Sequence, residues 1–173
     1  MNENSFFLKK EYREWCRIIK KEANIQIIVD ADATPVKTEI VELANQYSIK
    51  VLFVASYNHM TSNTLGCEWK YVDTDKESVD FYIMNHAKKL DIVVTQDIGL
   101  ASTLLLKGVE VIHPRGKIYS ESDISIALDM RYLSAKLRRG GKHTKGPKPF
   151  TEMDRIYFKE NFNKILSKYA GDL

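Results

Sequence analysis

Short segments rich in apolar and β-branched residues alternate with helix-like segments along this chain, and that alternation constrains the fold most. The strand-like segments are 25–30, 51–55, 68–72, 92–95 and 109–112. Between them, 36–47, 78–87 and 98–106 repeat apolar residues every three to four positions, as helices packed on one side do. Strands that alternate with helices predict an α/β fold with a mostly parallel five-stranded sheet and helices on both faces.

Amphipathic helices are predicted on both sides of this α/β unit. Residues 5–22 bring apolar side chains to one helical face, and Thr151 and Asp154 are spaced as in a capping box that opens a last helix. Before that helix lies a glycine-rich basic stretch. The sequence therefore divides into an N-terminal helical extension (1–24), an α/β domain (25–139), and a basic linker with a C-terminal helix packing on the domain (140–173).

Composition excludes several classes of protein. With 44% hydrophobic residues in 173, the chain has enough apolar side chains for one packed core. No apolar run approaches the length of a membrane-spanning helix, so no membrane contact is expected. Cys16 and Cys67 have no metal-ligand spacing, and the expected location is the cytoplasm with reduced thiols. The net charge of +3 is too small to indicate a partner.

Aspartates gather where the predicted strands end. Asp30 closes the first strand and Asp32 follows it, Asp97 follows the fourth, and Asp80 lies in the first turn of the helix after the third. Parallel strands present their carboxyl ends at one edge, where ligands bind. Because crowded carboxylates repel one another, this edge predicts a divalent cation, Mg²⁺ or Mn²⁺, held by these four residues.

Structural roles for the same residues stay open. Asp97 has the position of an N-cap for the helix that begins at Ile98, and Asp80 has that of a favourable charge in a first helical turn. Thr95 either orients a carboxylate or water by hydrogen bonding or is an ordinary β-branched strand residue. Asp73 and Asp75, after the third strand, are weaker candidates that suit a solvated loop.

Basic residues are expected to contact a nucleic-acid backbone. Between Met130 and Thr151 there are seven lysines and arginines and no acidic residue. Arg115, in the turn HPRG, is placed either to grip a phosphate or to pair with a nearby acid. The predicted substrate-binding residues are Arg115, Lys37, Arg138, Arg139 and Lys142.

Several long motifs resemble one bacterial family. DADATPVK (30–37), DIVVTQDIGLA (91–101), HPRG (113–116) and the downstream MRYLSAKLRRGG and GPKPFTEMDR are similar to the YaiI/YqxD family of uncharacterised bacterial proteins, over about residues 26–168. That family looks like a branch of the PIN-like (NYN-related) nuclease domains. In these, an aspartate ends the first strand, an acid lies in a central helix, and a Ser/Thr-x-Asp motif follows the fourth strand.

The resemblance implies metal-binding and catalytic roles for Asp30, Asp80 and Asp97, and a catalytic role for Thr95. Asp32 matches the family's own second aspartate and joins the set. The sequence departs from the family pattern DADACPV, because Thr34 stands in the place of the cysteine. Any role of that thiol is therefore absent here or passed to a hydroxyl.

The predicted function is metal-dependent hydrolysis of nucleic-acid phosphodiesters, with RNA favoured. Two alternatives stay open. Asp30, Asp32 and Thr34 fit the DxDxT pattern of haloacid-dehalogenase phosphatases, with Asp30 as nucleophile and Asp32 as general acid, although no acidic pair follows the fifth strand. A non-catalytic RNA-binding or regulatory module is the other. Whether the chain forms an oligomer is also left open.

Overall fold

The structure is a computed structural model that describes residues 25–75, 77–126, 129, 132, 139 and 148–170. The helix expected over 5–22 and the basic linker of 140–147 lie outside these residues. No helix among the described ones is long and apolar enough to cross a membrane.

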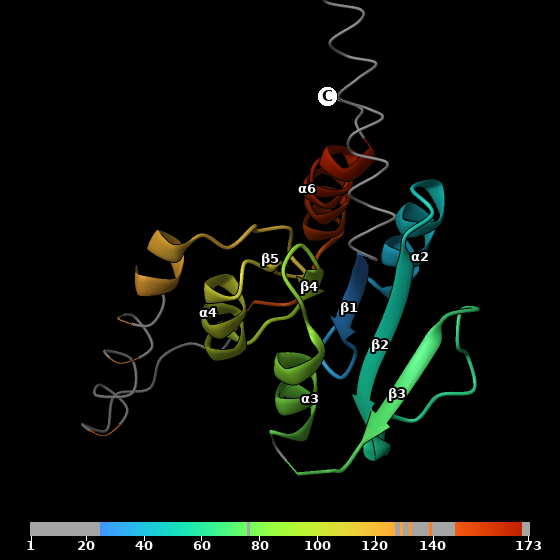
Figure 1. The fold of residues 1–173 in the computed structure, drawn as a ribbon, viewed down its shortest axis with the longest axis horizontal. Coiled ribbons are helices and arrows are strands. Elements are labelled where there is room, and N and C mark those ends of the chain that lie inside the picture. The colour runs from blue at the N-terminus through green and yellow to red at the C-terminus, as the bar shows by residue number, and fades with distance from the viewer. Residues whose placement is uncertain are drawn as a thin grey trace, which may run out of the picture.

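Five strands form one sheet in the order β3-β2-β1-β4-β5 (Figure 1). Their bounds are β1 Gln26–Asp30, β2 Lys50–Ser56, β3 Glu68–Val72, β4 Ile92–Val94 and β5 Glu110–Ile112. Every pair of neighbouring strands is parallel. The predicted α/β fold is confirmed, and the sheet expected to be mostly parallel is parallel throughout these strands.

The carboxyl ends of the strands lie together at one edge. β1 is central and pairs with β2 and β4, with Asp30 opposite Val54. Beyond the strand ends, Ala31 N–H donates to Val54 O at 2.8 Å and Thr95 N–H donates to Ile112 O at 3.2 Å. These bonds hold the backbone of the first residues after β1 and β4 in the plane of the sheet. The Cα atoms from which their side chains extend therefore have fixed positions.

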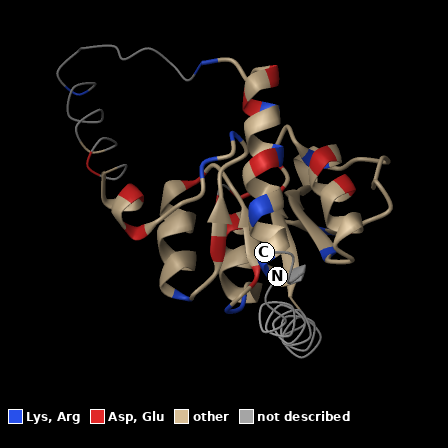
Figure 2. Ribbon diagram, turned by 90° about the horizontal axis from the view of Figure 1, so that it is seen from above, with Lys and Arg blue, Asp and Glu red and all other residues tan. Residues whose placement is uncertain are grey.

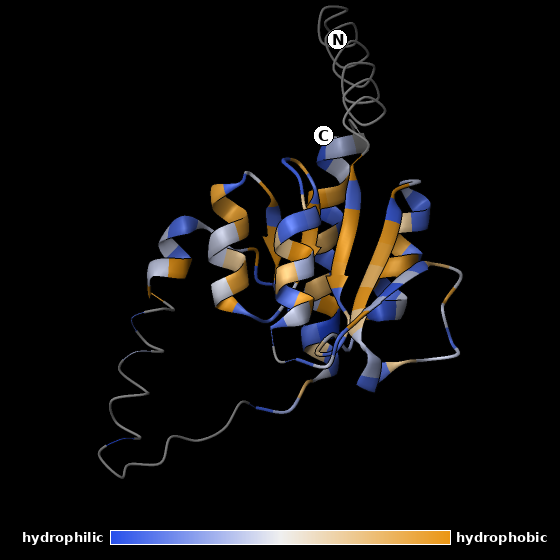
Figure 3. Ribbon diagram, turned by 60° about the horizontal axis from the view of Figure 1, so that its bottom comes forward, coloured by the Kyte–Doolittle hydropathy of each residue, from blue (hydrophilic) through white to orange (hydrophobic). Residues whose placement is uncertain are grey.

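Helices cover both faces of the sheet, as the view of Figure 2 shows. α2 (Lys37–Gln46) and α6 (Glu152–Ala170) pack on one face, and α3 (Ser78–His86) and α4 (Ile98–Leu106) pack on the other. Alternate residues of β1 serve the two cores: Ile27 and Val29 face α2 and α6, whereas Ile28 faces α3 and α4. The apolar strands between amphipathic helices are visible in Figure 3.

The C-terminal helix is part of the core. Phe158, Phe162, Ile165 and Leu166 are fully buried against the β1–β2 face. The predicted capping box is present, because Thr151 N–H donates to Asp154 Oδ2 at 2.8 Å and Asp154 N–H donates to Thr151 Oγ1 at 3.2 Å. The amphipathic C-terminal helix is therefore as the sequence predicted, and in the structure it packs on the sheet.

The HPRG turn lies directly against α6. Gly116 has φ +87°, and a Cβ there would lie 2.6 Å from the carbonyl carbon of Tyr157. The buried Asn161 amide donates to Gly116 O at 3.0 Å. Only glycine allows this close approach without moving the helix.

The start of α3 has no side-chain cap. Ser78 is the first helical residue, and Glu77 holds the cap position without a side-chain bond. The backbone already turns before the helix, since Ser78 N–H donates to Asp75 O at 3.0 Å and Phe81 N–H donates to Glu77 O at 2.9 Å.

Candidate functional site

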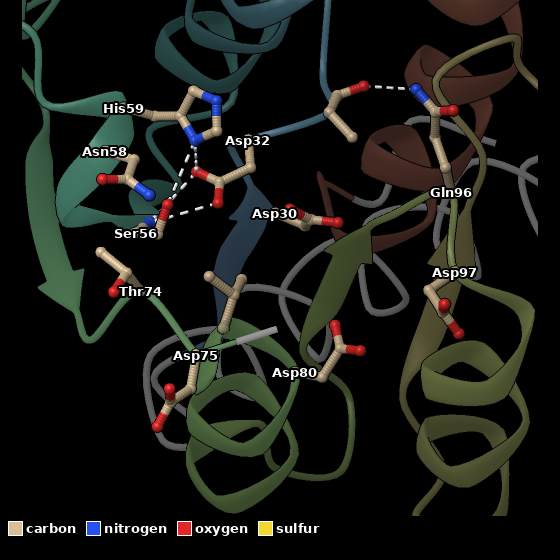
Figure 4. Close-up of a pocket in the computed structure, with 12 residues that line it drawn as sticks. Asp30, Asp32, Ser56, Asn58, His59, Thr74, Asp75, Asp80, Gln96 and Asp97 are labelled. Atoms are coloured by element: carbon tan, nitrogen blue, oxygen red, sulfur yellow. Dashed lines mark hydrogen bonds and ion pairs between the residues drawn. The ribbon is translucent and has the colours of Figure 1, made fainter. Parts of the chain in front are cut away.

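A cavity of about 430 Å³ opens beyond the carboxyl end of β1 (Figure 4). It is bounded by the turn after β1, the connection between β3 and α3, the first turn of α3, and the β4–α4 turn. The carboxylates that line it are Asp30, Asp32, Asp75, Asp80 and Asp97. The cavity, which we call the carboxylate cavity, thus contains all four aspartates predicted as metal ligands.

Asp30 is the buried residue of this set, with 8% of its surface exposed. The alternation along β1 turns its side chain toward the α3–α4 face, where Asp80 and Asp97 lie. Loss of hydration raises the pKa of Asp30, and the charges of Asp32 and Asp97 raise it further, against a lowering hydrogen bond from Thr95. Asp30 is therefore costly to ionise without a cation nearby.

Thr95 connects two of the aspartates. It is fully buried, its hydroxyl donates to Asp30 Oδ2 at 3.1 Å, and Asp97 N–H donates to Thr95 Oγ1 at 3.0 Å. The sequence left two interpretations of Thr95 open, and the structure shows the hydrogen bond to a carboxylate.

Asp97 and Asp80 form the wall on the α3–α4 side. Asp97 caps α4, as Oδ1 accepts from Gly99 N–H at 2.6 Å and Leu100 N–H at 3.0 Å. Asp80 lies in the first turn of α3, and burial, followed by the charges of Asp97 and Asp30, raises its pKa to about 6. The structural role predicted as an alternative for Asp97 is real, and the same side chain also lines the cavity.

Asp32 lies on the opposite wall. Its carboxylate accepts from Ser56 N–H at 3.1 Å and contacts His59 Nδ1 at 3.2 Å, and the same His59 nitrogen is 3.1 Å from Ser56 Oγ (Figure 4). No sequence pattern singles out Ser56, and His59 is one of several polar residues in the loop of residues 57–66.

Three further residues line the cavity. From the sequence, one of them is only a weaker candidate and the other two are not singled out. Asp75 and Thr74 follow β3, and Gln96 donates through its side-chain amide to Ala33 O. The strand-end rule that singles out Asp30 applies equally to Asp75, so that signal was present in the sequence. Nothing local to Gln96 indicates its bridge to the β1 turn.

The donor chemistry suits a hard, hydrated cation. Among the described residues, no three histidine, cysteine or carboxylate side chains converge on one point as ligands of a single ion. Asp32 and Asp97 are instead engaged with Ser56 and with the start of α4. Mg²⁺ ordinarily retains several waters and takes one or two carboxylates from the protein. The five carboxylates that line this cavity fit such an ion, and burial raises the pKa of two of them, Asp30 and Asp80.

Lys37 lies beside the carboxylates. Its ammonium donates to Thr34 O at 2.8 Å. Burial lowers the pKa of Lys37, and the neighbouring Asp30 and Asp32 oppose that shift. Thr34, at the family's cysteine position, is buried and donates its hydroxyl to Asp30 O at 2.6 Å, which closes the turn after β1.

Arg115 points to the start of α6. Its guanidinium donates to Lys148 O at 2.5 Å, Pro149 O at 3.2 Å and Asp154 Oδ2 at 2.5 Å, and it lies 5.5 Å from the centre of the Phe150 ring. These partners, which are not cavity residues, occupy the group predicted to grip a phosphate. The alternative of an ion pair is therefore the observed one, and Arg115 anchors the start of α6.

Of the three predicted basic contacts between residues 138 and 142, the structure describes one. Arg139 is exposed, and Arg138 and Lys142 lie outside the described residues. His113 behaves as expected of a turn residue, because its Nδ1 accepts from Arg115 N–H at 2.9 Å.

Comparisons with known proteins agree with the motifs. A family model described as "Uncharacterized BCR, YaiI/YqxD family" matches residues 28–168. The UPF0178 protein Bcer98_3021 of Bacillus cytotoxicus is 51% identical over 86% of this chain and 97% of its own length. The UPF0178 protein Lmo1456 of Listeria monocytogenes is 53% identical over 82% of this chain and 95% of its own length. No solved structure is a significant match. With the motifs, the length of the match and these identities in agreement, the chain belongs to the YaiI/YqxD family.

Proposed function

We propose that this protein is a metal-dependent phosphodiesterase of nucleic acid, with RNA as the favoured substrate. The observation that supports it best is the carboxylate cavity itself. Asp30, Asp32, Asp80 and Asp97 reach it from three different parts of the chain, at the edge of a parallel sheet where ligands bind.

Electrostatics supports a cation as part of this function. The pKa values of Asp30 and Asp80 are raised by burial and by other carboxylates, so the cavity disfavours its own ionised state. A dication reverses that penalty, since each carboxylate then faces an opposite charge. In this proposal Asp30, Asp32, Asp80 and Asp97 hold Mg²⁺ or Mn²⁺.

The side chains around the cavity have separate tasks. A bound Mg²⁺ or Mn²⁺ supplies an activated water and stabilises negative charge on the phosphate oxygens. Thr95 fixes the rotamer of Asp30 and favours its ionised form through the 3.1 Å hydrogen bond. Lys37 uses one of its three donors on Thr34 O and retains two that suit a phosphate. No serine or cysteine nucleophile is needed.

Cleavage of labelled RNA and DNA in the presence of Mn²⁺ or Mg²⁺ tests the proposal. We expect cleavage that EDTA abolishes and that Asp30→Asn and Asp97→Asn each reduce at least about a hundredfold. Asp73→Asn is the matched control, because Asp73 is an exposed carboxylate near the same edge that does not line the cavity. Absence of cleavage on single- and double-stranded RNA and DNA with both metals would overturn the proposal.

The same variants separate the other two functions that the sequence left open. A haloacid-dehalogenase phosphatase requires a phosphoaspartate on Asp30, which mass spectrometry of a trapped intermediate detects. A non-catalytic RNA-binding module predicts binding that survives both EDTA and Asp30→Asn. No contact in the described structure favours either one, and the turn after β5 offers His113 and Arg115 in place of an acidic pair.

A further inference from the structure

A second cavity, of about 470 Å³, adjoins the carboxylate cavity. The two share Asp32 and His59 as a common wall. We call the second one the loop cavity, because the loop of residues 57–66 forms its outer side. Its volume is in the range of ordinary small-molecule sites.

Two aromatic residues of β3 hold the loop in place. Trp69 Nε1–H donates to Thr64 O at 3.0 Å, and the Tyr71 hydroxyl lies 3.4 Å from both N and O of Thr61. Trp69 is itself stacked on the buried Phe53 at 4.7 Å between ring centres. The loop cavity is thus formed before any ligand arrives, which lowers the entropic cost of binding.

The walls of the loop cavity differ in chemistry. Leu65, Met60 and Trp69 supply apolar surface, and Met60 is 62% exposed. Thr38 and Asn63 supply polar groups, and within the described part of the chain neither the Thr38 hydroxyl nor the Asn63 amide nitrogen has a hydrogen-bond partner. A flat ligand with apolar faces and polar edges matches these walls, and a nucleobase is such a ligand.

Position links this cavity to the phosphate. Lys37 lines the loop cavity and lies near enough to Asp30 and Asp32 for their charges to affect it. A nucleotide whose phosphate lies at the shared wall therefore has its base directed into the loop cavity. A base that enters a protein cavity cannot remain paired in a duplex.

We propose that the loop cavity binds one unpaired nucleobase of the nucleic acid whose phosphate occupies the carboxylate cavity. The inference rests on the proposed function and narrows its substrate to single strands, loops or ends.

Trp69 offers a direct reporter of base binding. The sequence has two tryptophans, so Trp15→Phe leaves Trp69 as the sole one. Adenosine and uridine, which have no phosphate, are titrated in EDTA so that neither metal nor carboxylate repulsion enters. We expect a saturable change in Trp69 fluorescence, with a Kd weakened about tenfold in a Met60→Ala, Asn63→Ala double variant. Met153→Ala is the matched control, since Met153 is 69% exposed on α6.

A second measurement tests the need for an unpaired base. The Asp97→Asn variant in Mg²⁺ is titrated with a single-stranded RNA and with a fully paired duplex of the same sequence. We expect the single strand to change Trp69 fluorescence and the duplex to leave it unchanged. An equal response to the duplex, or no saturable response to either nucleoside, overturns the inference.

The two proposals fail in different ways. Metal-dependent cleavage without a Trp69 response leaves the nuclease in place and removes the base site. A Trp69 response to nucleosides without any cleavage retains the base site and removes the nuclease, because the nucleoside titration in EDTA needs neither metal nor catalysis.

Discussion

The hydroxyl of Thr95 donates a 3.1 Å hydrogen bond to Asp30 Oδ2, at a position where both residues are buried. This bond lowers the pKa of Asp30, whereas loss of hydration raises it. The same hydroxyl oxygen accepts from Asp97 N–H, so one side chain contacts both the carboxylate of Asp30 and the backbone of Asp97.

Replacing Thr95 with valine tests this relationship. We expect Thr95→Val to weaken Mn²⁺ binding about tenfold or more, since a buried hydrogen bond to a charged group contributes about 1.5–3 kcal/mol. Thr95→Ser retains the hydroxyl and is expected to stay within about threefold of the parent. Isothermal titration calorimetry measures both. Equal affinities in the valine and serine variants would show that the bond to Asp30 has no part in metal binding.

Asp80 makes the stability of the metal-free protein depend on pH. Its pKa is raised to about 6 from an ordinary value of 3.8, so the folded state holds the proton more tightly than the unfolded state does. The stabilising contribution is therefore complete below about pH 4 and is lost as the pH rises through about 6. In EDTA, we expect Asp80→Asn to reduce this fall in Tm between pH 4 and 7.

The control for this experiment is the addition of metal. Mn²⁺ binds the ionised carboxylates, so it is expected to raise the Tm of the parent most above pH 6. The explanation fails if the Tm of the Asp80→Asn variant in EDTA falls with pH as steeply as that of the parent.

Gly116 tests the close approach of the HPRG turn to α6. Gly116→Ala combines positive φ with a Cβ at 2.6–2.7 Å from the backbone of Tyr157 and Phe158. Gly66→Ala is the matched control, because its φ is +70° and nothing lies within 4 Å of the added Cβ. Strain at positive φ costs about 1–2 kcal/mol in both, and overpacking adds about 1–3 kcal/mol at Gly116 alone. Urea denaturation of the two variants is expected to show that difference, and equal values would contradict it.

Arg155 connects α6 to α2. It forms an ion pair with Glu39, a buried residue whose Oε2 has no partner among the described residues, and it lies 5.4 Å from the centre of the Phe150 ring. Arg155→Leu is expected to lower the Tm by about 3–6 °C, because Glu39 then lacks its counter-charge. Adding Glu39→Gln removes that charge and is expected to recover part of the loss. A double variant no more stable than Arg155→Leu would exclude this explanation.

Local chemistry explains which features were predictable. The strands are apolar and β-branched, and the helices have clear apolar faces, so β1 to β5 and the helices α2, α3, α4 and α6 follow from residue pattern alone. Asp30 was predictable for the same reason, since a charged residue that ends a buried strand has few places to lie. Asp97 and Thr95 followed from their position at the end of β4.

Side-chain direction was not predictable, because partners distant in sequence set it. Asp32 turns to the backbone of Ser56, 24 residues away, and Arg115 turns to Asp154, 39 residues away. Neither pairing leaves a periodic signal in the sequence. The partner of Arg115 and the role of Ser56 both come from contacts that exist only once the chain is folded.

The place of α6 in the core also bears on how the protein is made. Phe158 and Phe162 cover the face of the sheet that includes Ile27 and Phe53, yet the ribosome synthesises them after all five strands. During translation of the residues between β5 and α6, α2 is the one described helix that covers this face. We therefore expect folding to be completed only after α6 leaves the exit tunnel, since its buried aromatic residues complete the core on this face.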